Sequence, residues 1–101
     1  MISSKQRAEL RAMSNGIETI IHIGKSGITD TLTKQADDAL TARELIKGKV
    51  LENAPITSRE ACDALAKVCK AEPVQTIGTK FVLYRENKKL ATDKRIKLTN
   101  K

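Results

Sequence analysis

The stretch IETIIHIGKSGIT, residues 17–29, gives the clearest indication of fold class in this chain of 101 residues. Its first seven residues are rich in β-branched side chains and end at a glycine, which predicts a strand over residues 17–23. The loop GKSG follows at 24–27, and apolar residues then recur at spacings of three and four, which predicts an amphipathic helix over residues 29–41. Thr29 is suited to be the N-cap of that helix. A strand, a glycine-rich loop and a helix therefore follow one another, as in α/β folds.

An earlier helix is predicted before this stretch. Ser3 and Gln6 have the spacing of a capping box, and Asn15-Gly16 supplies a stop signal. Leu10 and Met13, three residues apart, mark its buried side.

A second strand is predicted over residues 44–52, where apolar and charged residues alternate. Ile46, Gly48 and Val50 share one face, while Lys47 and Lys49 share the other. A parallel strand that is covered by helices on both faces would be apolar throughout, whereas this strand has one solvent-exposed face. The helices should therefore lie mainly on one face of the sheet.

A third helix is predicted to begin at Thr57, which forms a capping box with Glu60, and to end before Pro73. Its inward positions are predicted to be Ala61, Ala64, Leu65 and Val68. Residues 74–77 and 80–85 then form two strands, joined by Gly78-Thr79 in a type II′ hairpin turn.

The predicted order is therefore α-β-α-β-α-β-β in one compact α/β domain with a four-stranded mixed sheet. Strands linked through helices favour largely parallel pairing, and the closing hairpin must be antiparallel. We place the domain at residues 1–85 and a basic, flexible tail at 86–101, where the chain is polar and charged.

The charge favours an anionic partner, because 19 Lys and Arg stand against 12 Asp and Glu, a formal net charge of +7. Residues 1–79 hold 11 basic and 10 acidic residues, whereas residues 80–101 hold 8 and 2, so the excess lies in the last fifth. That basic end is either a solvated tail or a phosphate contact. The only two aromatic residues, Phe81 and Tyr84, are too few for a platform that stacks bases. The composition favours binding to backbones rather than to bases.

The cysteines predict neither a disulfide nor a metal site. Cys62 and Cys69 lie seven residues apart in a predicted helix, roughly 10.5 Å along its axis, which a disulfide cannot span. His22, the single histidine, is far from both in sequence, so we interpret the cysteines as packing residues and expect no metal. The sequence also shows no secretory signal and no apolar run long enough to cross a membrane, so we expect a cytoplasmic protein with no membrane partner.

The GKSG loop is the best candidate for chemistry. Its two glycines let a ligand approach the backbone, the following helix offers N–H groups, and Lys25 and Ser26 add a charge and a hydroxyl donor. The alternative is a turn that uses glycine for its geometry alone. A Walker A loop is excluded because Thr19 stands where that motif needs its first glycine. The chain also lacks the third glycine that a dinucleotide-binding fingerprint requires. No second His or activated Cys supports hydrolysis, so we expect no enzyme.

Three blocks carry a resemblance to a known family: residues 21–29 around the loop, 44–47 with 49–50, and 74–78 with 82–85. With Ser4-Lys5-Gln6 and Leu10, the similarity runs from about Ser4 to Arg85. The chain resembles the bacterial YhbY-like proteins, single-domain members of the CRM (chloroplast RNA splicing and ribosome maturation) family. It departs from them in the third helix, with its cysteines, and in the tail. The resemblance implies a fold similar to the C-terminal domain of translation initiation factor three, RNA binding through the GxxG loop, and association with precursors of the large ribosomal subunit.

We therefore expect a monomeric, non-enzymatic RNA-binding protein that acts on ribosomal RNA and needs no cofactor or small-molecule substrate. Gly24 and Gly27 would shape the loop, Lys25 would contact phosphate and Ser26 would donate a hydrogen bond. The wider basic surface would comprise Lys5, Arg7, Arg11, Lys80, Arg85 and Lys88. Three alternatives stay open: a protein-interaction domain that docks through the Lys47 and Lys49 face or the tail, a general RNA-binding or chaperone module, and a phosphate enzyme for which no base is found.

Overall fold

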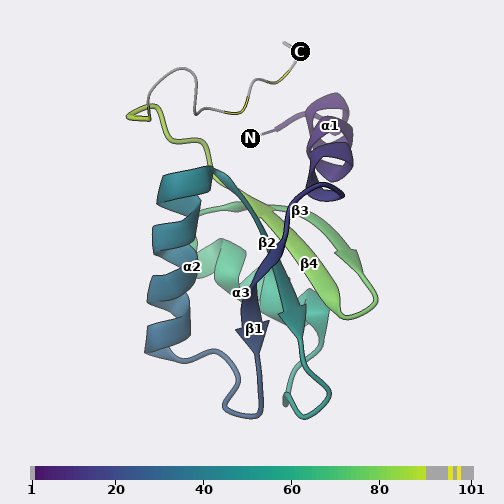
Figure 1. The fold of residues 1–101 in the computed structure, drawn as a ribbon, viewed down its shortest axis with the longest axis vertical. Coiled ribbons are helices and arrows are strands. Elements are labelled where there is room, and N and C mark those ends of the chain that lie inside the picture. The colour runs from purple at the N-terminus through teal and green to yellow at the C-terminus, as the bar shows by residue number, and fades with distance from the viewer. Residues whose placement is uncertain (1, 91–95, 97, 99–101) are drawn as a thin grey trace.

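The structure is a computed structural model that describes residues 2–90, 96 and 98. It is a single α/β domain with the order α-β-α-β-α-β-β, which confirms the predicted order (Figure 1). The elements are α1 (Ser4–Ser14), β1 (Thr19–Ile23), α2 (Asp30–Arg43), β2 (Leu45–Val50), α3 (Ser58–Cys69), β3 (Glu72–Ile77) and β4 (Lys80–Tyr84).

The three helices begin where the sequence predicts, because each has its own N-cap. The Ser3 hydroxyl accepts from the Gln6 backbone N–H at 3.2 Å, and the Gln6 side chain accepts from the Ser3 N–H at 3.0 Å. Thr57 and Glu60 form the same reciprocal pair at 3.1 and 2.9 Å. Thr29 caps α2 by accepting from the N–H of its third residue. Each cap satisfies helix N–H groups that lack a partner within the helix.

The four strands form one mixed sheet in the order β1-β2-β4-β3. β1 pairs with β2 in parallel, and β4 pairs antiparallel with both β2 and β3. β1, β2 and β3 run in the same direction, as their helical connections predict. The expectation of largely parallel pairing is nevertheless wrong, because β4 lies between β2 and β3 and leaves a single parallel pair.

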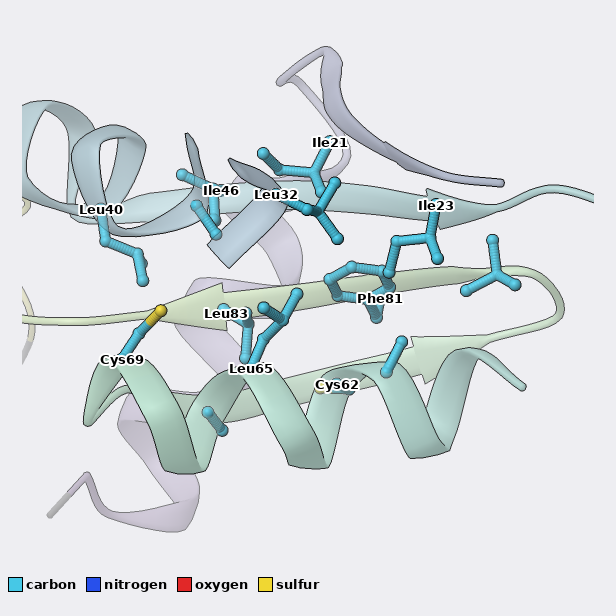
Figure 2. Packing of buried hydrophobic residues seen from close by; sticks show 14 residues of the cluster. Ile21, Ile23, Leu32, Leu40, Ile46, Cys62, Leu65, Cys69, Phe81 and Leu83 are labelled. Carbon is cyan, nitrogen blue, oxygen red and sulfur yellow. The ribbon is translucent and has the colours of Figure 1, made fainter. Parts of the chain in front are cut away.

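The main core lies between the sheet and the helices α2 and α3, as Figure 2 shows. The alternation predicted for β2 is confirmed, since Ile46 and Val50 face this core and Lys47 does not. α1 packs on the other face of the sheet, where Leu10 meets Val82 and Tyr84. Two of the three helices therefore cover one face, as predicted.

The buried face of α3 is rotated from the predicted one, although Ala61 and Leu65 are buried as predicted. Val68 is 61% exposed and Ala64 is also exposed, while Cys62, Ala66 and Cys69 are buried. The predicted spacing of three and four is satisfied by both sets of positions, so the periodicity alone gives the wrong rotation of the helix. Both cysteines are free and buried, which confirms that they pack in the core.

Gly48 is required by the packing of the main core. It lies directly opposite Phe81, whose side chain is fully buried. A Cβ at residue 48 would lie 2.7 Å from Cε1 and Cε2 of Phe81, which is closer than carbon atoms can approach. The ring therefore occupies the space that a side chain at residue 48 would need.

The ends of two strands differ from the prediction. β1 begins at Thr19 rather than Ile17, and β3 begins at Glu72, so that Pro73 lies inside the strand. β3 is an edge strand that pairs only with β4, and a proline can occupy an edge strand because the N–H it lacks is not needed there. The hairpin is confirmed, since Gly78 has a φ of +57°, as the first position of a type II′ turn requires.

Glu44, at the junction of α2 and β2, is fully buried, and no local sequence pattern indicates this burial. Its carboxylate accepts from the backbone N–H groups of Asn87 and Ile96, each at 2.7 Å. Ile96 and Leu98 pack beside the cluster around Leu10. The described part of residues 86–101 thus contacts the domain, while much of the predicted flexible tail lies outside the described residues.

Candidate functional site

The GKSG loop forms a tight turn between β1 and α2. The Gly27 N–H donates to the Gly24 carbonyl at 3.0 Å, and Gly27 has a φ of +67°, which a residue with a Cβ adopts only under strain. A Cβ at residue 27 would also lie 3.4 Å from Cγ of Pro55. The second glycine is therefore required by the geometry of the turn itself.

The loop packs against residues 51–55, the segment that follows β2. The Leu51 N–H donates to the Ile23 carbonyl at 2.8 Å, and the Ala54 N–H donates to the Leu51 carbonyl at 3.0 Å. Lys25 and Ser26, the two residues at the tip of the turn, are exposed. A supported backbone thus presents a cation and a hydroxyl to the solvent, an arrangement suited to a phosphate group.

The N-terminus of α2 contributes less to this site than the sequence predicts. The Thr29 hydroxyl already accepts from the Leu32 N–H at 3.1 Å, and Asp30 places a carboxylate in the first turn. A carboxylate at a helix N-terminus interacts favourably with the helix dipole and competes there with an external anion. Phosphate binding at this loop would therefore depend mainly on Lys25, Ser26 and the loop amides.

The basic residues predicted to widen the site lie at two ends of the molecule (Figure 1). Lys80 begins β4 at the same end of the sheet as the GKSG loop, where the Val50 N–H donates to the Thr79 carbonyl at 2.8 Å. The other five lie towards the opposite end. Three belong to α1, namely Lys5, Arg7 and Arg11, and two follow β4, namely Arg85 and Lys88. The structure therefore brings Lys80 towards the loop and keeps the other five apart from it.

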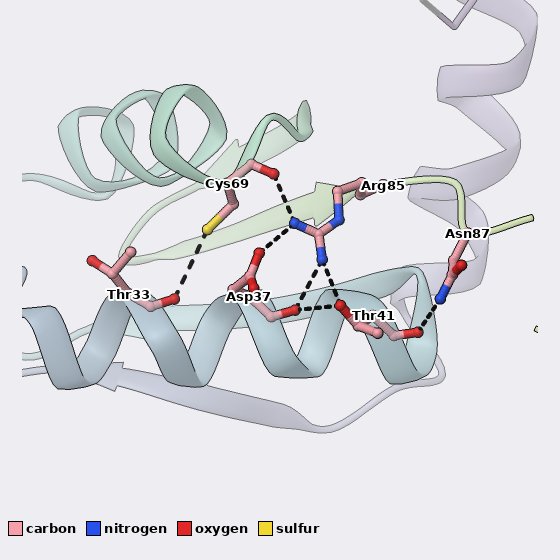
Figure 3. Close-up of polar contacts among 6 residues, drawn as sticks. All are labelled: Thr33, Asp37, Thr41, Cys69, Arg85 and Asn87. Atoms are coloured by element: carbon pink, nitrogen blue, oxygen red, sulfur yellow. Dashed lines mark hydrogen bonds and ion pairs between the residues drawn. The ribbon is translucent and has the colours of Figure 1, made fainter. Parts of the chain in front are cut away.

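Arg85 connects β4 to α2 and α3, as Figure 3 shows. Its guanidinium pairs with the Asp37 carboxylate at 2.6 Å and donates to the Cys69 carbonyl at 2.7 Å. It also donates to the Asp37 carbonyl and to the Thr41 hydroxyl, and its side chain is only 21% exposed. These contacts engage the guanidinium within the domain and give Arg85 a structural role.

Lys49 lies at the loop end of the sheet, although the sequence places it on the exposed face of β2 and not in the predicted RNA site. It lies opposite His22 of β1 on one side and opposite Lys80 of β4 on the other. The alternation of β2 predicted its face, but only the strand order shows that β4 brings a second lysine beside it.

The two cysteine thiols are poorly suited to nucleophilic catalysis. Burial and the nearby carboxylate of Asp63 raise the pKa of the Cys62 thiol to about 11, and burial is also the main cause that raises the pKa of Cys69. Thiols with raised pKa values stay protonated at neutral pH and are poor nucleophiles. Among the described residues there is no cluster of His, Cys, Asp and Glu that could hold a metal ion, and no helix long and apolar enough to cross a membrane.

Comparison with known proteins identifies relatives over most of the chain. "Probable RNA-binding protein YqeI" of Bacillus subtilis (strain 168) is 41% identical over 88 residues, which cover 87% of this chain and 92% of that protein. A protein of Haemophilus influenzae named "RNA-binding protein" is 33% identical over 84 residues, covering 83% and 85% of the two chains.

A solved structure has the same fold. The solution structure of the hypothetical protein SAV1595 from Staphylococcus aureus matches 98% of this chain and 100% of its own, with a TM-score of 0.79 and 39% sequence identity. The family model described as the CRS1 / YhbY (CRM) domain matches residues 2–85. The chain therefore belongs to the CRS1 / YhbY (CRM) domain family, as the three sequence blocks predict.

Proposed function

We propose that this chain binds RNA without catalysing a reaction, that the GKSG loop contacts the RNA backbone, and that the protein acts in assembly of the large ribosomal subunit. The observation that carries the proposal is the supported Gly24–Gly27 turn, which exposes Lys25 and Ser26 together. The family and the names of the relatives support RNA as the ligand. The ribosomal role rests on the resemblance to the YhbY-like proteins alone.

The aromatic residues support a backbone contact at this loop. Phe81 is fully buried and Tyr84 is 5% exposed, so neither ring is available to stack on a base. Proteins that bind single strands through bases depend on exposed rings for much of their affinity. Without them, the attraction between lysines and phosphates should dominate.

We expect the affinity for single-stranded RNA to fall steeply with salt, by about 0.7 log units per tenfold increase for each phosphate neutralised. Titrations of a fluorescently labelled RNA at several salt concentrations measure this slope.

The ribosomal role is tested by sedimentation of a cell extract, followed by crosslinking and sequencing of the bound RNA. Enrichment on large-subunit precursors is expected. A free protein without crosslinks, or one that binds a purified protein independently of salt, contradicts the proposal.

The first glycine of the loop offers a test that does not disturb the fold. Gly24 has no positive φ, and a Cβ there would lie 3.9 Å from Cδ1 of Leu51, an ordinary contact. We expect Gly24→Ala to keep the free energy of unfolding within about 0.5 kcal/mol of the wild type. It should weaken RNA binding if the backbone of Gly24 approaches RNA closely. Urea unfolding and RNA titration of the same sample measure the two effects, and unchanged affinity argues against such an approach.

A further inference from the structure

A row of accessible side chains crosses the sheet next to the GKSG loop. It lies on the face turned away from α2 and α3, and it follows the register pairs His22–Lys49, Lys49–Lys80 and Lys80–Ile77 from β1 to β3. His22 lies two residues before Gly24, so the row begins at the same end of the sheet as the loop. The row and the loop therefore lie at the same end of the sheet.

Lys49 and Lys80 are an unfavourable pair unless an anion lies near them. Side chains directly opposite each other on antiparallel strands have Cβ atoms roughly 4.5–5.5 Å apart, and like charges there destabilise the sheet. Among the described residues, no carboxylate lies within ion-pair distance of either lysine. A bound phosphate would compensate for both charges at once.

A hollow of about 200 Å³ lies beside this pair, between the sheet and the end of α1. We call it the sheet pocket, and the residues that line it include Asn15, Lys47, Gln75, Ile77, Lys80 and Val82. Lys47 donates to the Ser14 carbonyl at 3.3 Å and so ties the end of α1 to the sheet beside the pocket. A cavity of about 150 Å³ holds benzene, so this hollow is large enough for a planar ring.

The lining suits a nucleobase in particular. Val82 and Ile77 supply apolar lining, and Ile77 is 63% exposed, so its side chain is accessible to a ligand. The amides of Asn15 and Gln75 can each donate and accept hydrogen bonds, as the edges of bases require. Lys80 belongs both to the pocket and to the lysine pair, so a base and its phosphate could be held together.

We propose that the sheet pocket takes one unpaired base of the bound RNA, while Lys49 and Lys80 hold the adjacent phosphate. This rests on the proposed function and adds a base contact to a protein that otherwise holds the backbone. An acidic protein segment could form ion pairs with the lysines. It would make little use of the apolar lining and of the amides of Asn15 and Gln75. The charge and the shape together therefore favour RNA.

The test compares a single-stranded RNA of about 12 nucleotides with the same strand made abasic, because both carry the same phosphates. We expect the wild type to bind the intact strand about tenfold more tightly, at the low end of what a base contact contributes, since the lining is aliphatic. The variant Gln75→Ala/Ile77→Ser keeps every charge, and it should bind the intact strand about tenfold more weakly and no longer distinguish the two strands. The side-chain amide signals of Asn15 and Gln75 in NMR spectra should shift with the intact strand only.

A matched control is Gln35→Ala/Val68→Ser, which makes the same kind of change at exposed positions of α2 and α3. It should bind both strands as the wild type does, and thermal melts of both variants establish that they are folded. The sheet pocket is ruled out if the wild type binds both strands equally, or if the pocket variant still distinguishes them. It is also ruled out if the pocket variant loses binding only to an acidic peptide. Failure of the wild type to bind either strand contradicts the proposed function as well, so the two failures are distinguishable.

Discussion

The double substitution Lys25→Asp/Ser26→Asp is expected to reduce RNA affinity more than a hundredfold and to leave the melting temperature nearly unchanged. It replaces a cation and a hydroxyl donor with two carboxylates. Hydrogen bonds to charged groups contribute about 1.5–3 kcal/mol each, and repulsion from phosphate adds to the loss of both. Lys25 and Ser26 are exposed, so their replacement removes no packing. RNA titration and a thermal melt of the same preparation measure the two quantities.

The matched control is Ala64→Asp/Lys67→Asp on the exposed side of α3, since both double variants lower the net charge by three. If the loop itself is the contact, the control should retain most of the affinity, and the small loss should reflect net charge alone. Equal affinity in the wild type and the loop variant would remove the loop from the site. Equal losses in both variants would show that only the overall charge matters.

Gly48→Ala is expected to lower the free energy of unfolding by about 3 kcal/mol, the upper part of the usual range for an added methyl group in a packed core. The Cβ would overlap the ring of Phe81, which is fully buried between the sheet and the helices α2 and α3 (Figure 2). A domain of this size has roughly 5–15 kcal/mol of stability in total, so the loss is large. Urea unfolding followed by circular dichroism measures it.

Two variants separate this clash from a general effect of glycine replacement. Gly16→Ala should be neutral or slightly stabilising, because a Cβ there meets nothing closer than the Met13 carbonyl at 3.7 Å and φ is not positive. Gly48→Ala/Phe81→Leu should be less unstable than the sum of its single variants, because the smaller side chain makes room for the methyl group. Strict additivity would mean that the ring is not the cause.

In the candidate site, the sequence predicts features that depend on contacts between near neighbours in the chain. It does not predict those that depend on residues far apart. The GKSG loop could be singled out because its four residues form the turn among themselves, through a contact between Gly24 and Gly27. Arg85 could not be placed, since its partner Asp37 lies 48 residues away and nothing near Arg85 indicates the pair. The sheet pocket could not be found either, because α1, β2, β3 and β4 all contribute to it.

Helices and turns whose signals lie within a few residues could be predicted without the structure. The capping pairs Ser3–Gln6 and Thr57–Glu60, the glycine of the hairpin and the alternation of β2 all depend on contacts within one turn or one strand. The resemblance to the CRM family supplied the fold as a whole.

The rotation of α3, the insertion of β4 between β2 and β3, and the burial of Glu44 could be found only from the three-dimensional fold. Each depends on groups far apart in the chain, such as Glu44 and the N–H of Ile96, 52 residues later. An apolar period shows that a helix has a buried side, but several rotations satisfy it until the opposing surface is known. The pairing of Lys49 with Lys80, on which the proposed base contact depends, likewise exists only once β4 lies beside β2.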